Sequence, residues 1–184
     1  MKETPQQYSQ RILGFAGSQD PARVLAATPK KLSSLLRGLT PAMRRKRPAP
    51  GKWSISEIVA HLSETELVVG WRIRFILEKS GSPIQAMDQD IWARNSRYEK
   101  MDIRLALDAF RAQRAVNLRL LKLLTPEMKA RYGMHSERGK ESVAHIARLY
   151  AGHDLNHLSQ IEGIRNLSKG ALRRAPLNPA RSRE

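Results

Sequence analysis

The segment from Ser142 to Arg165 constrains the fold of this chain more than any other stretch. Its apolar residues recur at the three- and four-residue spacing of a helix that is buried along one face. Two histidines, His153 and His157, occupy positions in this stripe where the pattern calls for apolar side chains. Side chains four residues apart lie one above the other on a helix, so both imidazoles are expected to face the same interior space. Because unpaired polar groups in a core are costly, the pair needs a partner, and a divalent metal ion could serve both.

Three further segments have the same amphipathic pattern and are predicted to be helices. Each opens with a start signal: Thr28-Pro29 in the first, the capping box Ser54-Ile55-Ser56-Glu57 in the second and Asp102 in the third. No segment alternates convincingly between polar and apolar residues, so no β-strand is expected. The fold class is therefore all-α, a four-helix bundle with two long connections, and its helices are predicted at residues 28–39, 54–79, 102–124 and 142–165.

A long connection, residues 80–100, joins the second and third predicted helices. Connections of this length often carry functional residues. Within it, Asp88 to Asn95 is expected to form one or two helical turns, with Trp92 as an anchor. The other connection, residues 40–52, is basic and contains proline. Short extra helices are therefore expected between the main ones.

The composition restricts the chemistry that the chain can carry. Its 184 residues are enough for one domain with a substantial core, and cysteine is absent, so a metal ion would be bound by imidazole or oxygen and not by thiolate. No apolar run approaches the roughly 18 residues of a membrane helix, and no apolar stretch follows the charged N-terminus as it would in a secretory signal. A cytoplasmic location without membrane contact is therefore expected.

The net charge is +16, from 33 Lys and Arg against 17 Asp and Glu, and it could attract nucleic acid, an acidic partner or an anionic substrate. The basic residues gather only at residues 44–52 and 169–183. Neither cluster is strongly aromatic, as base-stacking surfaces are, and no recognition-helix motif is present. A nucleic-acid-binding protein is therefore the last of the alternatives, and a solvated basic surface explains the charge more simply.

Three of the predicted helices carry polar residues where the core is expected. His61 lies at the edge of the apolar stripe of the second helix, with Arg72 on the same edge, and Arg114 lies in the stripe of the third. Together with His153 and His157, His61 would supply three imidazoles from two helices and leave part of the coordination sphere of a metal ion open, as in a reactive centre. Zn²⁺, Ni²⁺, Fe²⁺ and Mn²⁺ all accept imidazole, so the ligand type does not select among them.

Simpler interpretations remain open for these residues. A single histidine on an apolar edge can be a hydrogen-bonded core residue, and Arg114 can form a structural ion pair, for example with Glu66, instead of binding a substrate anion. Glu57, four residues before His61, could ligate or orient that histidine, but capping already explains it. The other candidates are Trp53, Trp92 and Tyr150 as pocket walls, and Asp154 and Asn156 as groups that orient the neighbours of the ligands.

Two sequence motifs resemble a known family. Residues 51–77, GKWSISEIVAHLSETELVVGWRIRFIL, and residues 151–164, AGHDLNHLSQIEGI, contain the patterns W-S-x-x-E-x-x-x-H-L and H-D-x-x-H-x-x-Q-I. The two patterns are specific when they occur together, and they resemble the DinB/YfiT-like superfamily. The resemblance covers about residues 28–167, which is most of the chain.

The resemblance implies an up-down-down-up four-helix bundle with a divalent metal ion held by three histidines, which on matching positions are His61, His153 and His157. Members of the superfamily are often dimers, and Leu155 and Leu158, which point away from the histidine stripe, could form a dimer face or pack on the first helix. Some relatives are thiol-dependent transferases or isomerases that use a low-molecular-weight thiol such as bacillithiol, mycothiol or glutathione. Others are described only as metal-dependent hydrolases.

From these observations we expect a DinB-like domain at residues 28–167, preceded by an N-terminal extension with short helices at 1–27 and followed by a basic, flexible tail at 168–184. The expected function is that of a metal-dependent enzyme, either a thiol-dependent transferase or a hydrolase, that acts on a small molecule. The first alternative is a non-enzymatic bundle in which the metal ion only stabilises the fold. The second alternative is the nucleic-acid-binding protein.

Overall fold

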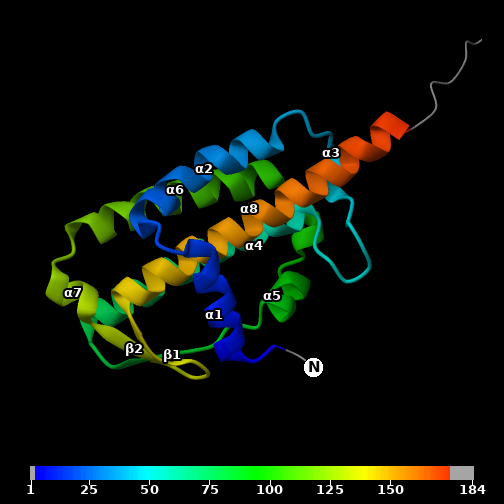
Figure 1. Ribbon diagram of the computed structural model, residues 1–184. Helices are drawn as coiled ribbons and strands as arrows, with labels where there is room; N and C mark the ends of the chain where they lie inside the picture. The colour runs from blue at the N-terminus through cyan, green and yellow to red at the C-terminus, as the bar shows by residue number, and fades with distance from the viewer. Residues whose placement is uncertain (1–2, 175–184) are drawn as a thin grey trace, which may run out of the picture.

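Four long helices form the body of the protein in the computed structural model, which describes residues 3–174 (Figure 1). They are α2 (Pro21–Leu36), α4 (Ile55–Glu78), α6 (Ile103–Leu123) and α8 (Val143–Arg174). α2 and α4 each lie beside both α6 and α8, so every long helix contacts two others. This arrangement confirms the four-helix bundle that was predicted from the sequence.

The bundle encloses two clusters of buried apolar residues. Leu158 belongs to one of them, together with Leu32 of α2 and Phe110 of α6, and Leu155 packs against both clusters. Of the two roles that the sequence left open for these leucines, packing on the first helix is confirmed. The homodimer remains a prediction, and sedimentation equilibrium at micromolar concentration would test it.

Helix α4 begins at the capping box that the sequence indicated. The Ser54 hydroxyl accepts a hydrogen bond from the backbone N–H of Glu57 (3.3 Å), and the Glu57 carboxylate accepts one from the N–H of Ser54 (2.8 Å). The guanidinium of Arg47 also donates to this carboxylate. Glu57 is therefore engaged at the end of the helix, as capping predicted, and does not ligate or orient His61.

Helix α2 begins earlier than predicted and runs through the expected start signal at Thr28-Pro29. The Asp20 side chain caps its N-terminus. Pro29 lies inside the helix, where it has no N–H to donate to the carbonyl of Leu25. The guanidinium of Arg114, 89 residues further along the chain, donates to that carbonyl instead (2.9 Å). This contact lets the helix continue, so the boundary predicted between residues 27 and 28 falls within a helix.

A small three-stranded sheet lies at one end of the bundle, where the sequence predicted no strand. β1 (Ser82–Ile84) runs parallel to β2 (Tyr132–His135), and β2 forms a hairpin with the antiparallel strand β3 (Gly139–Ser142). Strands of three or four residues are too short to show a clear alternation, which is why the pattern did not reveal them. The pairing of β1 with β2 joins the long connection after α4 to the hairpin that leads into α8.

Helix α1 (Pro5–Ala16) packs across α8, close to the predicted metal ligands. Ile12 and Ala16 of α1 are fully buried. The close approach needs glycine on α8, because a Cβ atom at Gly152 would lie 2.0 Å from the carbonyl oxygen of Ile12. The N-terminal segment that was predicted as an extension is thus packed against the helix that carries two of the three histidines.

Short helical segments lie in the connections, including the one predicted at Asp88 to Asn95. They are α3 (Pro41–Arg45), α5 (Gln89–Asn95), the 3-10 helix η1 (Tyr98–Lys100) and α7 (Pro126–Ala130). α8 continues to Arg174, past its predicted end at Arg165, so the first part of the predicted flexible tail is helical. The rest of that tail, residues 175–184, lies outside the described residues. Among the described helices, none combines the length and the apolar character needed to cross a membrane.

Candidate metal centre

Three histidine side chains meet in the interior of the bundle. His61 comes from α4, and His153 and His157 come from successive turns of α8. The Nε2 atom of His153 lies 3.0 Å from Nε2 of His61 and 3.1 Å from Nε2 of His157. All three side chains are buried, and one ligand atom from each lies within 4.8 Å of the others. Among residues 3–174, no other group of three His, Asp or Glu side chains is arranged to hold a metal ion.

The spacing of these nitrogens suits a shared metal ion. Imidazole nitrogens bind Zn²⁺ at about 2.0–2.1 Å, so two of them at octahedral or tetrahedral angles lie roughly 2.9–3.4 Å apart. Both observed Nε2 separations fall in this range. The donor set therefore fits a divalent ion, and these three histidines are the residues that would hold it.

Hydrogen bonding alone does not satisfy the cluster. The carbonyl oxygen of the Gln160 side chain lies 2.9 Å from Nδ1 of His157 and can only accept, so Nδ1 carries the proton and Nε2 keeps its lone pair. The Nε2 atom of His153 can hold one proton and can donate it to only one of its two neighbours. Its Nδ1 atom is buried and has no hydrogen-bond partner among the described residues. A cation between the three Nε2 atoms would offset the repulsion between the lone pairs that remain.

Burial keeps the three imidazoles neutral. Desolvation lowers the pKa of His61 and of His153 well below the usual value of 6.5, and the nearby His157 lowers both further. Desolvation also lowers the pKa of His157 to about 4, against the opposing effect of its hydrogen bond to Gln160. Because only the neutral imidazole binds a metal ion, the cluster is ready to bind one near pH 7 without first losing protons.

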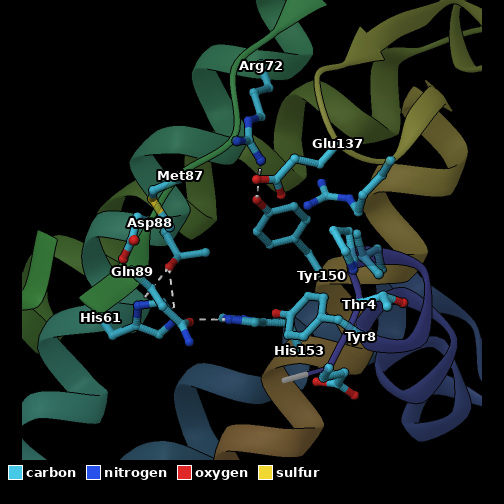
Figure 2. Close-up of a pocket in the computed structure, with 15 residues that line it drawn as sticks. Thr4, Tyr8, His61, Arg72, Met87, Asp88, Gln89, Glu137, Tyr150 and His153 are labelled. Atoms are coloured by element: carbon cyan, nitrogen blue, oxygen red, sulfur yellow. Dashed lines mark hydrogen bonds between the residues drawn. The ribbon is translucent and has the colours of Figure 1, made fainter. Parts of the chain in front are cut away.

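A cavity of about 470 Å³ opens beside the cluster (Figure 2). His61 and His153 lie at one end of this cavity and Arg72 lies at the other, with Tyr150 between them. Its wall is formed by α1, α4, α8, the long connection after α4 and the β2–β3 hairpin, and no residue of α2 or α6 lines it. The remaining lining residues are Glu3, Thr4, Pro5 and Tyr8 at the start of α1, Thr65 of α4, Met87, Asp88 and Gln89 of the long connection, Glu137 and Arg138 of the hairpin, and Leu149 of α8.

The fold agrees with a comparison to known proteins. A family model described as the DinB superfamily matches residues 25–161, about three-quarters of the chain. The chain belongs to the DinB superfamily. The family that the two sequence motifs predicted is thereby confirmed.

Two relatives of this DinB-superfamily protein are informative. A protein of Oceanobacillus iheyensis, provisionally named a metal-dependent hydrolase, is 27% identical over 116 residues, which cover 61% of this chain and 64% of that protein. The chain thus matches less than two-thirds of that relative's length. The solved structure of YfiT from Bacillus subtilis, described as a probable metal-dependent hydrolase with an unusual four-helix bundle topology, has a TM-score of 0.75 at 18% identity. That similarity covers 92% of this chain and 91% of YfiT, and it shows a common fold.

In this DinB protein, Arg114 anchors a buried ion cluster near the three histidines and does not line the cavity beside them. It donates to Glu66 Oε2 from Nε (2.9 Å) and Nη2 (2.7 Å), and to the two carboxylate oxygens of Asp154 (2.6 and 3.1 Å). Burial lowers the pKa of Arg114, but the two carboxylates together raise it above its usual value. The expectation that Arg114 binds a substrate anion is therefore corrected, and the alternative, a structural ion pair with Glu66, is present.

The aromatic candidates next to the histidines flank the cluster. The ring of Trp53 lies 4.8 Å from the ring of His61, measured between centroids, and the ring of Tyr150 lies 5.8 Å from that of His153. Trp53 lines a second cavity of about 590 Å³, whereas Tyr150 lines the cavity at the histidines. Both rings are therefore placed to shield imidazoles from bulk solvent.

The other sequence candidates lie away from the ligands. Trp92 of α5 is 37% exposed and lines neither of these two cavities. The side-chain oxygen of Asn156 accepts a hydrogen bond from Arg11 of α1 (3.4 Å), and the Asp154 carboxylate is directed at Arg114. Asn156 and Asp154 thus hold neighbouring helices, and no hydrogen bond joins either of them to a described histidine.

Several residues of the site were not singled out from the sequence. Gln160 orients His157 from three residues further along α8, and the H-x-x-Q spacing was a signal that could have found it. Thr65 follows His61 by one turn of α4, and its hydroxyl lies 3.4 Å from Nε2 of His61. Tyr8 reaches the cavity from α1, and no local pattern indicates this, because α1 meets α8 only in the folded chain.

Proposed function

We propose that the protein is a metal-dependent enzyme of the hydrolase type, whose divalent ion is held by Nε2 of His61, His153 and His157. The observation that carries this proposal is the convergence of three buried, neutral imidazoles at the end of a cavity. When bound, such an ion would lower the pKa of a water molecule, or of a thiol, toward neutrality and so supply a nucleophile. The provisional hydrolase descriptions of the relative and of YfiT support the same class of reaction.

The protein's own side chains would prepare the centre for this role. Gln160 holds the proton of His157 on Nδ1 and so directs the Nε2 lone pair of that ring to the centre. His61 and His153 line the cavity, so a molecule in the cavity would meet the open side of the ligand set. The rings of Trp53 and Tyr150 cover these two histidines and limit the access of bulk water.

The number of ligands favours a reactive centre over a structural one. Structural zinc sites are usually closed by four protein ligands, whereas catalytic sites keep a position for water or substrate. Within residues 3–174 the cluster has three ligands, and no carboxylate joins it. A thiol could occupy the open position as well as water, which would make the enzyme a thiol-dependent transferase.

Elemental analysis of the purified, untagged protein tests the metal site. We expect about one divalent ion per chain, as a single three-histidine centre would hold. His61→Ala should lose the ion, whereas His145→Ala, which removes a partly exposed histidine outside the cluster, should keep it. Absence of metal from the protein, even after reconstitution with Zn²⁺ and Ni²⁺, would contradict the proposal.

Chelation and activity assays separate the enzyme from the structural alternative. Because an ion that binds only the folded state stabilises it, chelation should lower the melting temperature and added metal should restore it. A panel of esters and amides, with and without added thiol, then tests turnover, which His153→Ala should abolish with little change in helicity. A chelator-sensitive melting temperature without any turnover would favour the structural alternative, and turnover only with thiol would favour the transferase.

A further inference from the structure

Arg72 is a buried cation at the end of the cavity opposite the histidines (Figure 2). Only 5% of its surface is exposed. Its guanidinium donates to the hydroxyl of Tyr150 (3.1 Å) and to the backbone carbonyl of Gln85 (2.6 Å). Both acceptors are uncharged, and no carboxylate within residues 3–174 forms an ion pair with Arg72 at 4.0 Å or less. The charge of Arg72 is therefore solvated but not neutralised.

Unlike Arg72, the buried Arg114 has carboxylate counterions. Burying a charge without a counterion is costly, and at Arg114 the carboxylates of Glu66 and Asp154 offset that cost. Arg72 is buried to a similar degree, but the space beside it is a cavity. The counterion of Arg72 is thus expected to come from a molecule that enters this cavity.

The other charged groups of the cavity wall do not supply that counterion. The second guanidinium, that of Arg138, is paired with both carboxylate oxygens of Glu141 (2.6 and 3.0 Å). Three carboxylates also line the cavity. Glu137 is exposed at the tip of the hairpin. Asp88 accepts hydrogen bonds from two backbone amides of α5, and Glu3 forms an ion pair with Arg11. None of these three carboxylates forms an ion pair with Arg72, so its guanidinium has no counterion within 4.0 Å among the described residues.

We propose that the cavity binds a small carboxylic acid whose carboxylate pairs with Arg72 and whose reacting bond lies at the three histidines. The hydroxyl oxygen of Tyr150 accepts from Arg72, so its own proton is free to donate to the same carboxylate. One unpaired guanidinium matches one negative charge, which suits a carboxylate better than a phosphate dianion. This assignment names the substrate class of the proposed metal-dependent reaction, and it rests on that proposal for the position of the reacting bond.

The distance between the two ends of the cavity limits the length of the acid. Tyr150 and His153 are three residues apart on α8, a rise of about 4.5 Å along the helix, and their ring centroids are 5.8 Å apart. The Tyr150 hydroxyl points toward Arg72 and away from His153 (Figure 2), so a carboxylate bound there would lie farther from the histidines than the two rings lie from each other. The labile bond of the acid would therefore be separated from its carboxylate by a spacer of several bonds, as in an N-acyl amino acid or a half-ester.

Binding to the metal-free protein tests the assignment without relying on turnover. N-acetylglycine and the neutral N-acetylglycinamide differ in the carboxylate, and ligand-detected NMR titrations of the chelator-treated protein give a Kd for each. We expect the acid to bind at least about 10-fold more tightly than the amide, and Arg72→Met to weaken acid binding by about 10- to 100-fold. Arg74→Met removes the same charge from an exposed position on α4 and should leave the preference for the acid unchanged.

Two further variants separate recognition from folding. Arg72→Lys keeps the charge but loses the planar fork, and should retain part of the preference for the acid. Tyr150→Phe keeps the ring and loses the donor, and should weaken acid binding by less than Arg72→Met does. Melting curves followed by circular dichroism show whether each variant is folded.

Equal binding of the acid and the amide by the wild type would overturn the assignment. So would equal losses in Arg72→Met and Arg74→Met, and Arg72 would then be only a clamp between α4 and the backbone of Gln85. Because the protein is chelated, either result would leave the proposed metal centre standing. A protein that prefers the acid but never binds metal would instead overturn the proposed function alone.

Discussion

Acidification should destabilise the metal-free protein in the pH range where free histidine titrates. Four histidines have a pKa below the usual 6.5 in the folded chain, and desolvation is the largest cause for each: His61, His135, His153 and His157. They stay neutral in the folded protein at pH values where the unfolded chain binds a proton. Their contribution to stability is therefore fully present above about pH 6.5, and it is lost as the pH falls toward their folded values, about 4 for His135 and His157.

The size of the effect follows from proton linkage. Between pH 6.5 and 5.5, a histidine that titrates only in the unfolded chain lowers the free energy of unfolding by about 1 kcal/mol. Four such histidines lower it by about 4 kcal/mol together, which is a large part of the roughly 5–15 kcal/mol of a typical domain. Carboxylates remain mostly ionised in this interval, so the change reports mainly on imidazoles.

Urea unfolding in the presence of a chelator, followed by circular dichroism at pH 6.5 and 5.5, measures this change. His157→Gln should reduce it by about 1 kcal/mol, because one titrating imidazole is removed. His145→Gln removes an imidazole outside the cluster and serves as the control. A change below about 1 kcal/mol in the wild type would refute the reasoning, since the histidines could not then be both buried and neutral in the folded chain.

Two further pairs of substitutions test the packing around the histidines. Arg114→Met leaves two buried carboxylates without their cation and should lower the free energy of unfolding by about 3–5 kcal/mol in urea titrations. Arg111→Met, on the same helix but in an exposed ion pair, should cost no more than about 1 kcal/mol. Gly152→Ala would push a methyl group into the backbone of Ile12, so we expect displacement of α1 and a loss of about 1–3 kcal/mol in thermal melts. Gly163→Ala, with open space around it on α8, should raise stability by about 0.5–1 kcal/mol, and equal effects within either pair would contradict this packing.

Much of the architecture could be predicted from local patterns in the sequence. The capping box at Ser54 located the start of α4, and the apolar stripe of residues 142–165 identified the helix that carries His153 and His157. These features can be predicted from the sequence because capping and helical periodicity involve residues only three or four positions apart. The third histidine, His61, was found because it lies at the edge of the apolar stripe of the second helix, and the two motifs around these histidines identified the family.

Other features could not be predicted, because their causes lie far apart in the chain. Nothing near Pro29 shows that α2 can pass through it, since the donor that replaces the missing N–H comes from Arg114 on α6. The sheet depends on pairing between residues 82–84 and 133–135, in strands too short to have a pattern of their own. The sequence placed Arg114 in an apolar stripe and Arg72 at the edge of another, and it could not tell which of them has carboxylate partners.

The sequence by itself determined the four amphipathic helices, the family and the three histidines, because each depends on the order of residues within a few helical turns. Only the tertiary structure decided which arginine is neutralised, where the cavity lies and that α1 closes one side of it. These properties depend on how distant helices pack, and burial turns a small difference in packing into a large difference in the cost of a charge. Arg72 and Arg114 have the same side chain, and their surroundings give one a structural role and leave the other facing a cavity.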